Sequence, residues 1–200
     1  ACIFYGDMLC ALRNQVAPYE NEKGAADKMV DLWVTRLGRV LLAGKGYTAK
    51  EMKHTFPLIA KDFAAIPVTR VPKVKVGVVG EIYVKFSPLG NNRLEEFLLS
   101  EGCEPVLPGL MDFCLYCIYN SVIDHDLYSR NAKTAMIYKM VYQFVLSKQT
   151  DIIKMMKKDG HFRPPMAFDE VRRKSHAIIG QGVKMGEGWL LPAEMVELIS

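Results

Sequence analysis

The chain has 200 residues, 50% of them hydrophobic, which is enough for one large core or slightly more than one domain. Its net charge of +4 is mild, and lysines alternate with acidic residues, so we expect no nucleic-acid partner. No apolar run reaches the roughly 18 residues that a membrane span requires, and we expect no membrane association. With no targeting signal in view, the odd number of cysteines, 5, favours reduced thiols in a cytoplasmic protein.

Residues 1–70 are expected to form a mainly helical segment. Residues 27–44 carry a stripe of apolar side chains at helical spacing, with Asp27 as the expected N-cap and Gly44 as the terminator. A second helix is predicted from Thr48, because Thr48 and Glu51 have the spacing of a capping box.

Residues 71–200 are expected to form an α/β segment. The run KVKVGVVGEIYV, residues 73–84, is rich in β-branched side chains and nearly continuous, which is typical of a strand covered on both faces of a parallel sheet. A helix capped by Asn91 or Asn92 and ended by Gly102 follows, and CEPVLPG, residues 103–109, reads as the returning strand. The spacing predicts one βαβ unit over residues 73–108.

The remainder of this segment is predicted to be helical apart from one glycine-rich loop. Residues 131–160 are apolar on more than one face, so we expect this long helix to be well covered, with Gly160 at its end. The loop at residues 180–188 precedes a last helix with Pro192 in its first turn.

The first candidate site is the loop that follows the predicted strand. Parallel sheets present ligands beyond the carboxyl ends of their strands, and a helix N-terminus attracts anions. The residues expected to face a ligand there are Gly80, Glu81, Tyr83, Asn91 and Asn92. The alternative is structural: Glu81 pairs with Lys85 or Arg93, and the asparagines only cap a helix.

The glycine-rich loop is the second candidate site. Closely spaced glycines let the backbone approach a phosphate or an inorganic group. The expected ligand-facing residues are Lys184, Gly186, Glu187, Gly188 and Trp189. The alternative is a plain connection with glycines that end helices.

Cys114 and Cys117 form a CxxC motif, which is a weak candidate for metal binding or redox cycling. The surrounding LMDFCLYCIY is apolar and helical, and no second cysteine pair or nearby histidine accompanies it. Packing of both thiols as small apolar groups is therefore the favoured interpretation. We name no catalytic residue.

Three segments in order, GDMLCALRNQVAPYE, KVGVVGEIYVKFSPLGNNRLEEFLLSEGCEPVLP and GVKMGEGWLLPAEMVELI, carry a family resemblance. They resemble the C-terminal portion of CoA-substrate-specific enzyme activases, the large relatives of the 2-hydroxyglutaryl-CoA dehydratase activator. That portion is itself similar to the D-component of 2-hydroxyacyl-CoA dehydratase, an iron–sulfur protein. The resemblance spans nearly the whole chain.

The resemblance implies a flavodoxin-like (Rossmann-like) parallel sheet with extensive helical decoration and a 4Fe–4S cluster held in a cleft between lobes. It also implies electron transfer in an ATP-dependent reductase or dehydratase system whose ATPase lies in another module. In such relatives a cysteine-bearing segment follows GEGWLL, and Pro192 stands where a capping Thr is expected.

From these features we expect a fragment of such an iron–sulfur protein that holds no cluster and is not catalytic alone. Its expected partners are other modules of the parent protein or an ATPase activator, with a CoA ester as the candidate ligand. The alternative is a non-redox α/β module that binds an acyl-CoA or a phosphate-bearing ligand.

Overall fold

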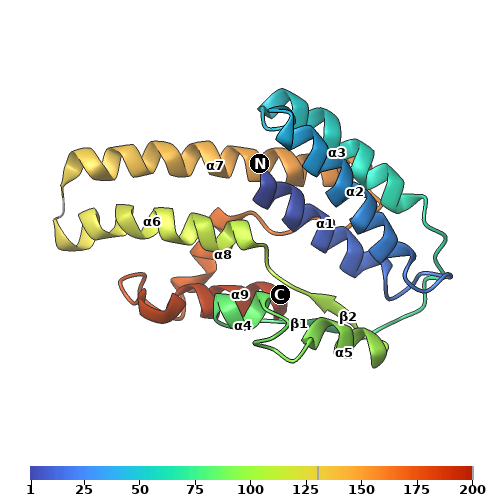
Figure 1. The fold of residues 1–200 in the computed structure, drawn as a ribbon. Helices are drawn as coiled ribbons and strands as arrows, with labels where there is room; N and C mark the ends of the chain where they lie inside the picture. The colour runs from blue at the N-terminus through green and yellow to red at the C-terminus, as the bar shows by residue number, and fades with distance from the viewer. Residues whose placement is uncertain (130, 200) are drawn as a thin grey trace. The chain divides into compact units, whose positions relative to one another are not determined.

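The structure, a computed structural model that describes residues 1–129 and 131–199, is mostly helical (Figure 1). Helices account for 65% of the chain and strands for 4%. The elements in chain order are α1 (Cys2–Val16), α2 (Ala25–Leu42), α3 (Ala49–Ala64), β1 (Lys75–Gly77), α4 (Ile82–Phe86), α5 (Leu94–Ser100), β2 (Glu104–Val106), α6 (Leu110–Tyr128), α7 (Ala132–Asp159), α8 (Phe168–Ser175), the single 3₁₀ turn η1 (Met185–Glu187) and α9 (Leu190–Ile199).

The chain divides into two compact units, each built from segments that are far apart in the sequence. Unit 1 comprises Ala1–Val76, Arg93–Val106 and Asp151–Pro164. Unit 2 comprises Gly77–Asn92, Leu107–Thr150 and the chain from Pro165 onward. The helical segment expected over residues 1–70 falls within unit 1, and the segment expected over residues 71–200 is shared by both units.

Unit 1 is organised around α1, which contacts α2, α3 and β2. Tyr5 on α1 is buried; its ring centroid lies 5.2 Å from that of Phe56 on α3, and its hydroxyl donates to the Gly46 carbonyl at 2.8 Å. The strands β1 and β2 form a parallel pair beside these helices. Unit 1 is therefore a small helical core with a two-stranded edge.

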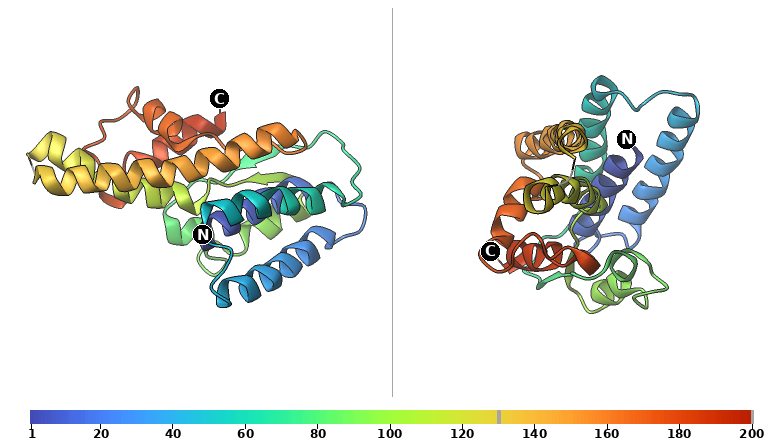
Figure 2. Two further views of the ribbon diagram at one scale, coloured as in Figure 1. Left: turned by 90° about the horizontal axis from the view of Figure 1, so that it is seen from above. Right: turned by 90° about the vertical axis from the view of Figure 1, so that its left-hand side faces the viewer.

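Unit 2 is built on a cluster of aromatic rings contributed by α6, α7, α8 and the start of the last helix. Trp189 and Phe168 are completely buried, with ring centroids 6.1 Å apart. Tyr142 on α7 contacts Phe168 and, at 5.1 Å between centroids, Tyr119 on α6. The contact between Tyr119 and Tyr142 joins α6 to α7, and Figure 2 shows these helices in two further views.

The expectation of a flavodoxin-like α/β fold is wrong. Within the described residues the only strands are β1 and β2, of 3 residues each, and they pair only with each other. The β-branched run does not form a covered strand: Val74 is 69% exposed, and the chain turns into helix α4 at Ile82. Glu81 starts that helix by accepting hydrogen bonds from Tyr83 N and Val84 N, so a local cap ends the extended segment.

Other local predictions had mixed outcomes. The capping box at Thr48 and Glu51 is confirmed, and Gly160 follows α7 with φ +74°. The predicted cap at Asn91 or Asn92 is wrong, because α5 begins at Leu94 and the cap position is Arg93 in a left-handed conformation. The Asn91 side chain instead donates to the Lys85 carbonyl at 3.3 Å.

Candidate functional site

The two loops predicted to face a ligand meet in unit 2. Glu187, which ends η1, is 6% exposed, and its Oε1 accepts a hydrogen bond from the backbone N–H of Ile82 at 2.9 Å. Gly186 and Glu187 both have positive φ, +60° and +62°, and this left-handed turn forms the bend from which Glu187 reaches Ile82. The structure therefore brings together two segments that are 105 residues apart.

Glu81 has a local role in this arrangement. Its carboxylate accepts hydrogen bonds from Tyr83 N at 2.9 Å and Val84 N at 3.3 Å, which satisfies two of the free N–H groups at the start of α4. Of the alternatives open in the sequence, pairing with Lys85 or Arg93 is not what Glu81 does: Lys85 binds Glu194, and Arg93 binds Glu96.

The neighbouring predicted residues differ in exposure. Tyr83 is 57% exposed, and its ring covers Gly90, where an added Cβ would lie 2.8 Å from Tyr83 Cε1. Gly80 is not needed for close packing, since its added Cβ would lie 4.0 Å from Val84. Asn92 has φ +54° and continues into the left-handed Arg93. Tyr83 is thus the predicted residue of this loop with the largest exposed ring.

At the centre of the candidate site lies a buried ion pair that the sequence interpretation missed. Lys85 Nζ lies 2.7 Å from Glu194 Oε1, and the side chains are 1% and 0% exposed. Burial raises the pKa of Glu194; the Lys85 ammonium opposes that shift, and the negative charge of Glu187 adds to it. One signal was present in the sequence: Lys85 is the one charged residue of IYVKF, and the mainly apolar stretch LLPAEMVELI contains Glu194 and Glu197.

Two buried carboxylate oxygens remain at this pair. Within the described part of the chain, Oε2 of Glu187 and Oε2 of Glu194 are buried without a hydrogen-bond partner. Such atoms are costly in a folded protein unless the carboxyl group takes up a proton.

Glu197 lies one turn further along α9. Burial raises its pKa to about 7, against the hydrogen bond from the Met166 backbone N–H; Glu194 and Glu170 raise it further and Lys174 lowers it. Three glutamates, Glu187, Glu194 and Glu197, thus share this region with a single buried lysine. The ion pair and the Glu187 hydrogen bond brace α4 against the C-terminal segment.

The predicted residues of the glycine-rich loop are held by partners within the unit. Trp189 is fully buried, and its Nε1–H donates to Asn120 Oδ1 at 3.0 Å. Lys184 pairs with Asp124, and its carbonyl accepts a hydrogen bond from the Tyr116 hydroxyl. A Cβ on Gly188 would strike the Val183 carbonyl oxygen, so the glycine permits a close backbone approach.

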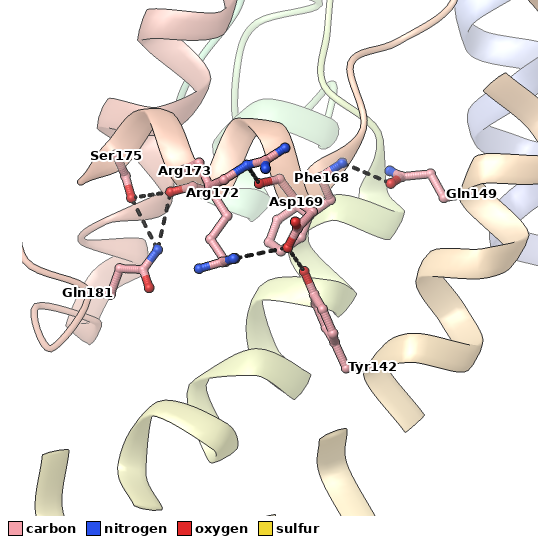
Figure 3. A network of polar contacts seen from close by, with 8 residues as sticks. All are labelled: Tyr142, Gln149, Phe168, Asp169, Arg172, Arg173, Ser175 and Gln181. Atoms are coloured by element: carbon pink, nitrogen blue, oxygen red, sulfur yellow. Dashed lines mark hydrogen bonds and ion pairs between the residues drawn. The ribbon is translucent and has the colours of Figure 1, made fainter. Parts of the chain in front are cut away.

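A second polar network links α7 to α8 in unit 2 (Figure 3). Asp169 accepts hydrogen bonds from the Tyr142 hydroxyl at 3.1 Å and from Arg172 at 3.0 Å, and Gln149 accepts from Phe168 N at 2.9 Å. Burial raises the pKa of Asp169, but the hydrogen bond and charge of Arg172 outweigh it and hold the pKa below its ordinary value. These hydrogen bonds hold α8 against α7.

The cysteines do not form a cluster site. Cys2, Cys10 and Cys117 are exposed, and Cys103 and Cys114 are half-buried. Burial raises the pKa of Cys117, which lowers its reactivity at neutral pH. Among the residues that the structure describes, no group of three or more His, Cys, Asp and Glu side chains could hold a metal ion.

No protein family, curated protein or solved structure matches this chain. Within the described ranges, no helix is both long and apolar enough to cross a membrane.

Proposed function

We propose that this chain is a structural part of an iron–sulfur electron-transfer protein of the activase and 2-hydroxyacyl-CoA dehydratase kind, and that it is not catalytic by itself. One observation carries the proposal: the two most specific motifs of the resemblance bind each other. Lys85, in VGEIYVKF, pairs with Glu194, in GEGWLLPAEM, and Ile82 donates to Glu187.

This contact holds together two segments that are far apart in the sequence. A buried lysine and a buried glutamate are each costly alone, and each offsets the burial of the other. Loss of either side chain would leave the other charge buried without its partner. The pairing supports a common structural framework in the proteins that carry both motifs, as the resemblance implies.

The proposal places the cluster and the ATPase in other parts of a longer, cytoplasmic protein or in its partner. The five cysteines of this chain do not gather, so no step is assigned to them. The role proposed for the chain is to present a rigid surface to the modules that bind the cluster and the CoA ester.

The test is anaerobic reconstitution with iron and sulfide of the longest natural protein that contains this chain, with the chain alone as a control. Iron and acid-labile sulfide are assayed, and the charge-transfer absorbance of a cluster is recorded. We expect a cluster in the longer protein and none in the chain alone. A longer protein that stays colourless and iron-free would overturn the proposal.

A module that binds an acyl-CoA or a phosphate-bearing ligand has less support. Lys184, the lysine of the glycine-rich loop, is paired with Asp124, and Glu187 is buried against the Ile82 N–H, so both side chains are already engaged within the unit. Calorimetric titration of the chain with acetyl-CoA and with ATP distinguishes the two proposals, since micromolar binding without metal would favour the module.

A further inference from the structure

Helix α7 carries apolar side chains on two opposite faces within unit 2. One face is buried: Ala135 is 8% exposed and Tyr142 3%, and Tyr142 packs on Tyr119 and Phe168. The other face is open and consists of Met136, Ile137, Met140, Val141 and Phe144, with exposures of 61%, 55%, 60%, 42% and 64%. We call these five residues the α7 stripe. The sequence predicts that other elements cover this helix well, but in the structure only one of its two apolar faces is covered.

The α7 stripe has the spacing of a helix-binding surface. Its members recur on three successive turns, two side by side on each of the first two turns, and then Phe144. They extend over about 12 Å along the helix axis, since an α-helix rises 1.5 Å per residue. A narrow ridge of this kind packs against the apolar face of another helix.

The charges that α7 itself places near the stripe are all of one sign. From Ala132 to Thr150 the only charged residues are Lys133, Lys139 and Lys148. Helical spacing places Lys133 one turn before the stripe, Lys139 along one edge and Lys148 one turn beyond it. Lys148 Nζ lies 5.2 Å from the centroid of the Phe144 ring, so this ammonium borders the stripe directly.

The three lysines indicate which kind of partner could bind to the α7 stripe. A second copy of the chain, packed stripe on stripe, would set lysines near lysines and be repelled. A bilayer surface is a poor match, because membrane binding grows with the apolar area that is buried and the stripe extends over only about 12 Å. Glutamates or aspartates beside the apolar face of a partner helix would pair with all three lysines.

We propose that the α7 stripe docks an amphipathic helix of a partner protein or module whose apolar face is flanked by acidic residues. The apolar side chains supply the burial, and the lysines fix the register and exclude basic helices. The proposal concerns association only and is independent of whether the parent protein holds an iron–sulfur cluster.

The test uses two synthetic helical peptides of about three heptads, with leucine at the two apolar heptad positions and either glutamate or lysine at the flanking positions. Each is labelled and titrated with the full chain by fluorescence anisotropy. We expect the glutamate peptide to bind and the lysine peptide to bind at least about tenfold more weakly. Absence of binding by both peptides, or equal binding of both, would overturn the proposal.

Matched variants locate the binding. Val141→Glu is expected to weaken binding of the glutamate peptide by about tenfold or more. Val34→Glu makes the same change at a valine on α2 that is 55% exposed, and it should leave binding unchanged. Lys139→Glu should weaken the glutamate peptide and strengthen the lysine peptide. Circular dichroism melts confirm that each variant is folded, and an equal loss with Val34→Glu would contradict the assignment.

The same variants also test whether a second copy of the chain or a membrane covers the α7 stripe. Analytical ultracentrifugation over a concentration series detects self-association, and co-sedimentation detects binding to phosphatidylserine–phosphatidylcholine vesicles. Dimerisation or vesicle binding that Val141→Glu abolishes and Val34→Glu preserves would show that a second copy or a membrane covers the stripe, and would overturn the proposal.

Discussion

The ammonium of Lys85 and the carboxylate of Glu194 form a buried ion pair at 2.7 Å across 109 residues of sequence. Lys85 comes from α4, a helix of only 5 residues, and Glu194 from α9. Because a five-residue helix is not stable alone, α4 depends on contacts such as this pair and the Glu187 hydrogen bond. The 77–92 segment is therefore ordered only when the C-terminal helix is in place to form this pair.

Removing one partner of this pair should be strongly destabilising. Lys85→Met leaves the Glu194 carboxylate buried without its counter-charge, and we expect the free energy of unfolding to fall by about 3–5 kcal/mol. The double variant Lys85→Met/Glu194→Leu should recover most of that loss, because it buries no charge. Urea unfolding followed by circular dichroism measures both.

The matched control for this experiment is Lys28→Met. Lys28 pairs with Glu22 at a similar distance, 2.6 Å, but the two side chains are 71% and 76% exposed. Its loss should leave stability nearly unchanged, since exposed pairs contribute little. Equal effects of Lys85→Met and Lys28→Met would show that burial of the first pair is not what matters.

The hydrogen bond between Glu187 and Ile82 should protect one specific amide. Glu187→Ala leaves the Ile82 N–H without its acceptor, at a cost of about 1–3 kcal/mol, and exchange of that amide should become faster. Glu81→Ala removes only the cap of α4, a loss of about 0.5–2 kcal/mol, and the fold should survive. Hydrogen exchange followed by NMR separates the two, and outright unfolding of Glu81→Ala would contradict this account.

The glycines of the 180–188 loop should differ sharply in their tolerance of alanine. At Gly188 an added Cβ would strike the Val183 carbonyl oxygen, and we expect Gly188→Ala to cost about 1–3 kcal/mol. At Gly180 no described atom lies within 4 Å of an added Cβ and φ is not positive, so Gly180→Ala should be tolerated. Thermal melts of the two variants provide the comparison; similar melting temperatures would mean that the loop is free to rearrange.

Stability should depend on pH through Glu197. Burial raises its pKa from 4.5 to about 7, so between these values the folded chain holds a proton that the unfolded chain has lost. The free energy of unfolding contributed by this group is therefore full below pH 4.5 and falls as the pH rises through 7. The raised pKa of Glu194 acts in the same direction.

Glu197→Gln should flatten this fall, because an amide does not titrate. Urea unfolding of the variant and the parent chain at several pH values across the window measures the difference. Glu22→Gln is the control: Lys28 lowers the pKa of Glu22, so its contribution is present above its ordinary pKa and lost as the pH falls. A pH profile of Glu197→Gln that matches the parent would show that Glu197 ionises normally in the folded chain.

The sequence predicts local features of this protein well and the sheet poorly. The capping box at Thr48 and Glu51 depends on atoms within one turn, so its residue types suffice. Strand extent depends on pairing with a distant segment, and the valines of residues 74–79 have a partner for only three residues. The β-branched composition therefore overstated the sheet, and the extended segment ends where Glu81 starts α4.

The sequence by itself determined the capping box that starts α3 and the glycines that follow α2, α5 and α7, because caps and glycines act within a few residues. It did not determine where every helix starts, since α2 begins at Ala25, before the expected cap Asp27, and α5 is preceded by Arg93. Only the tertiary structure decided that Lys85 and Glu194 are buried together, that Glu187 reaches Ile82, and that one apolar face of α7 stays open. Burial and pairing depend on which distant segments meet. A residue's own neighbours in the chain carry little information about that.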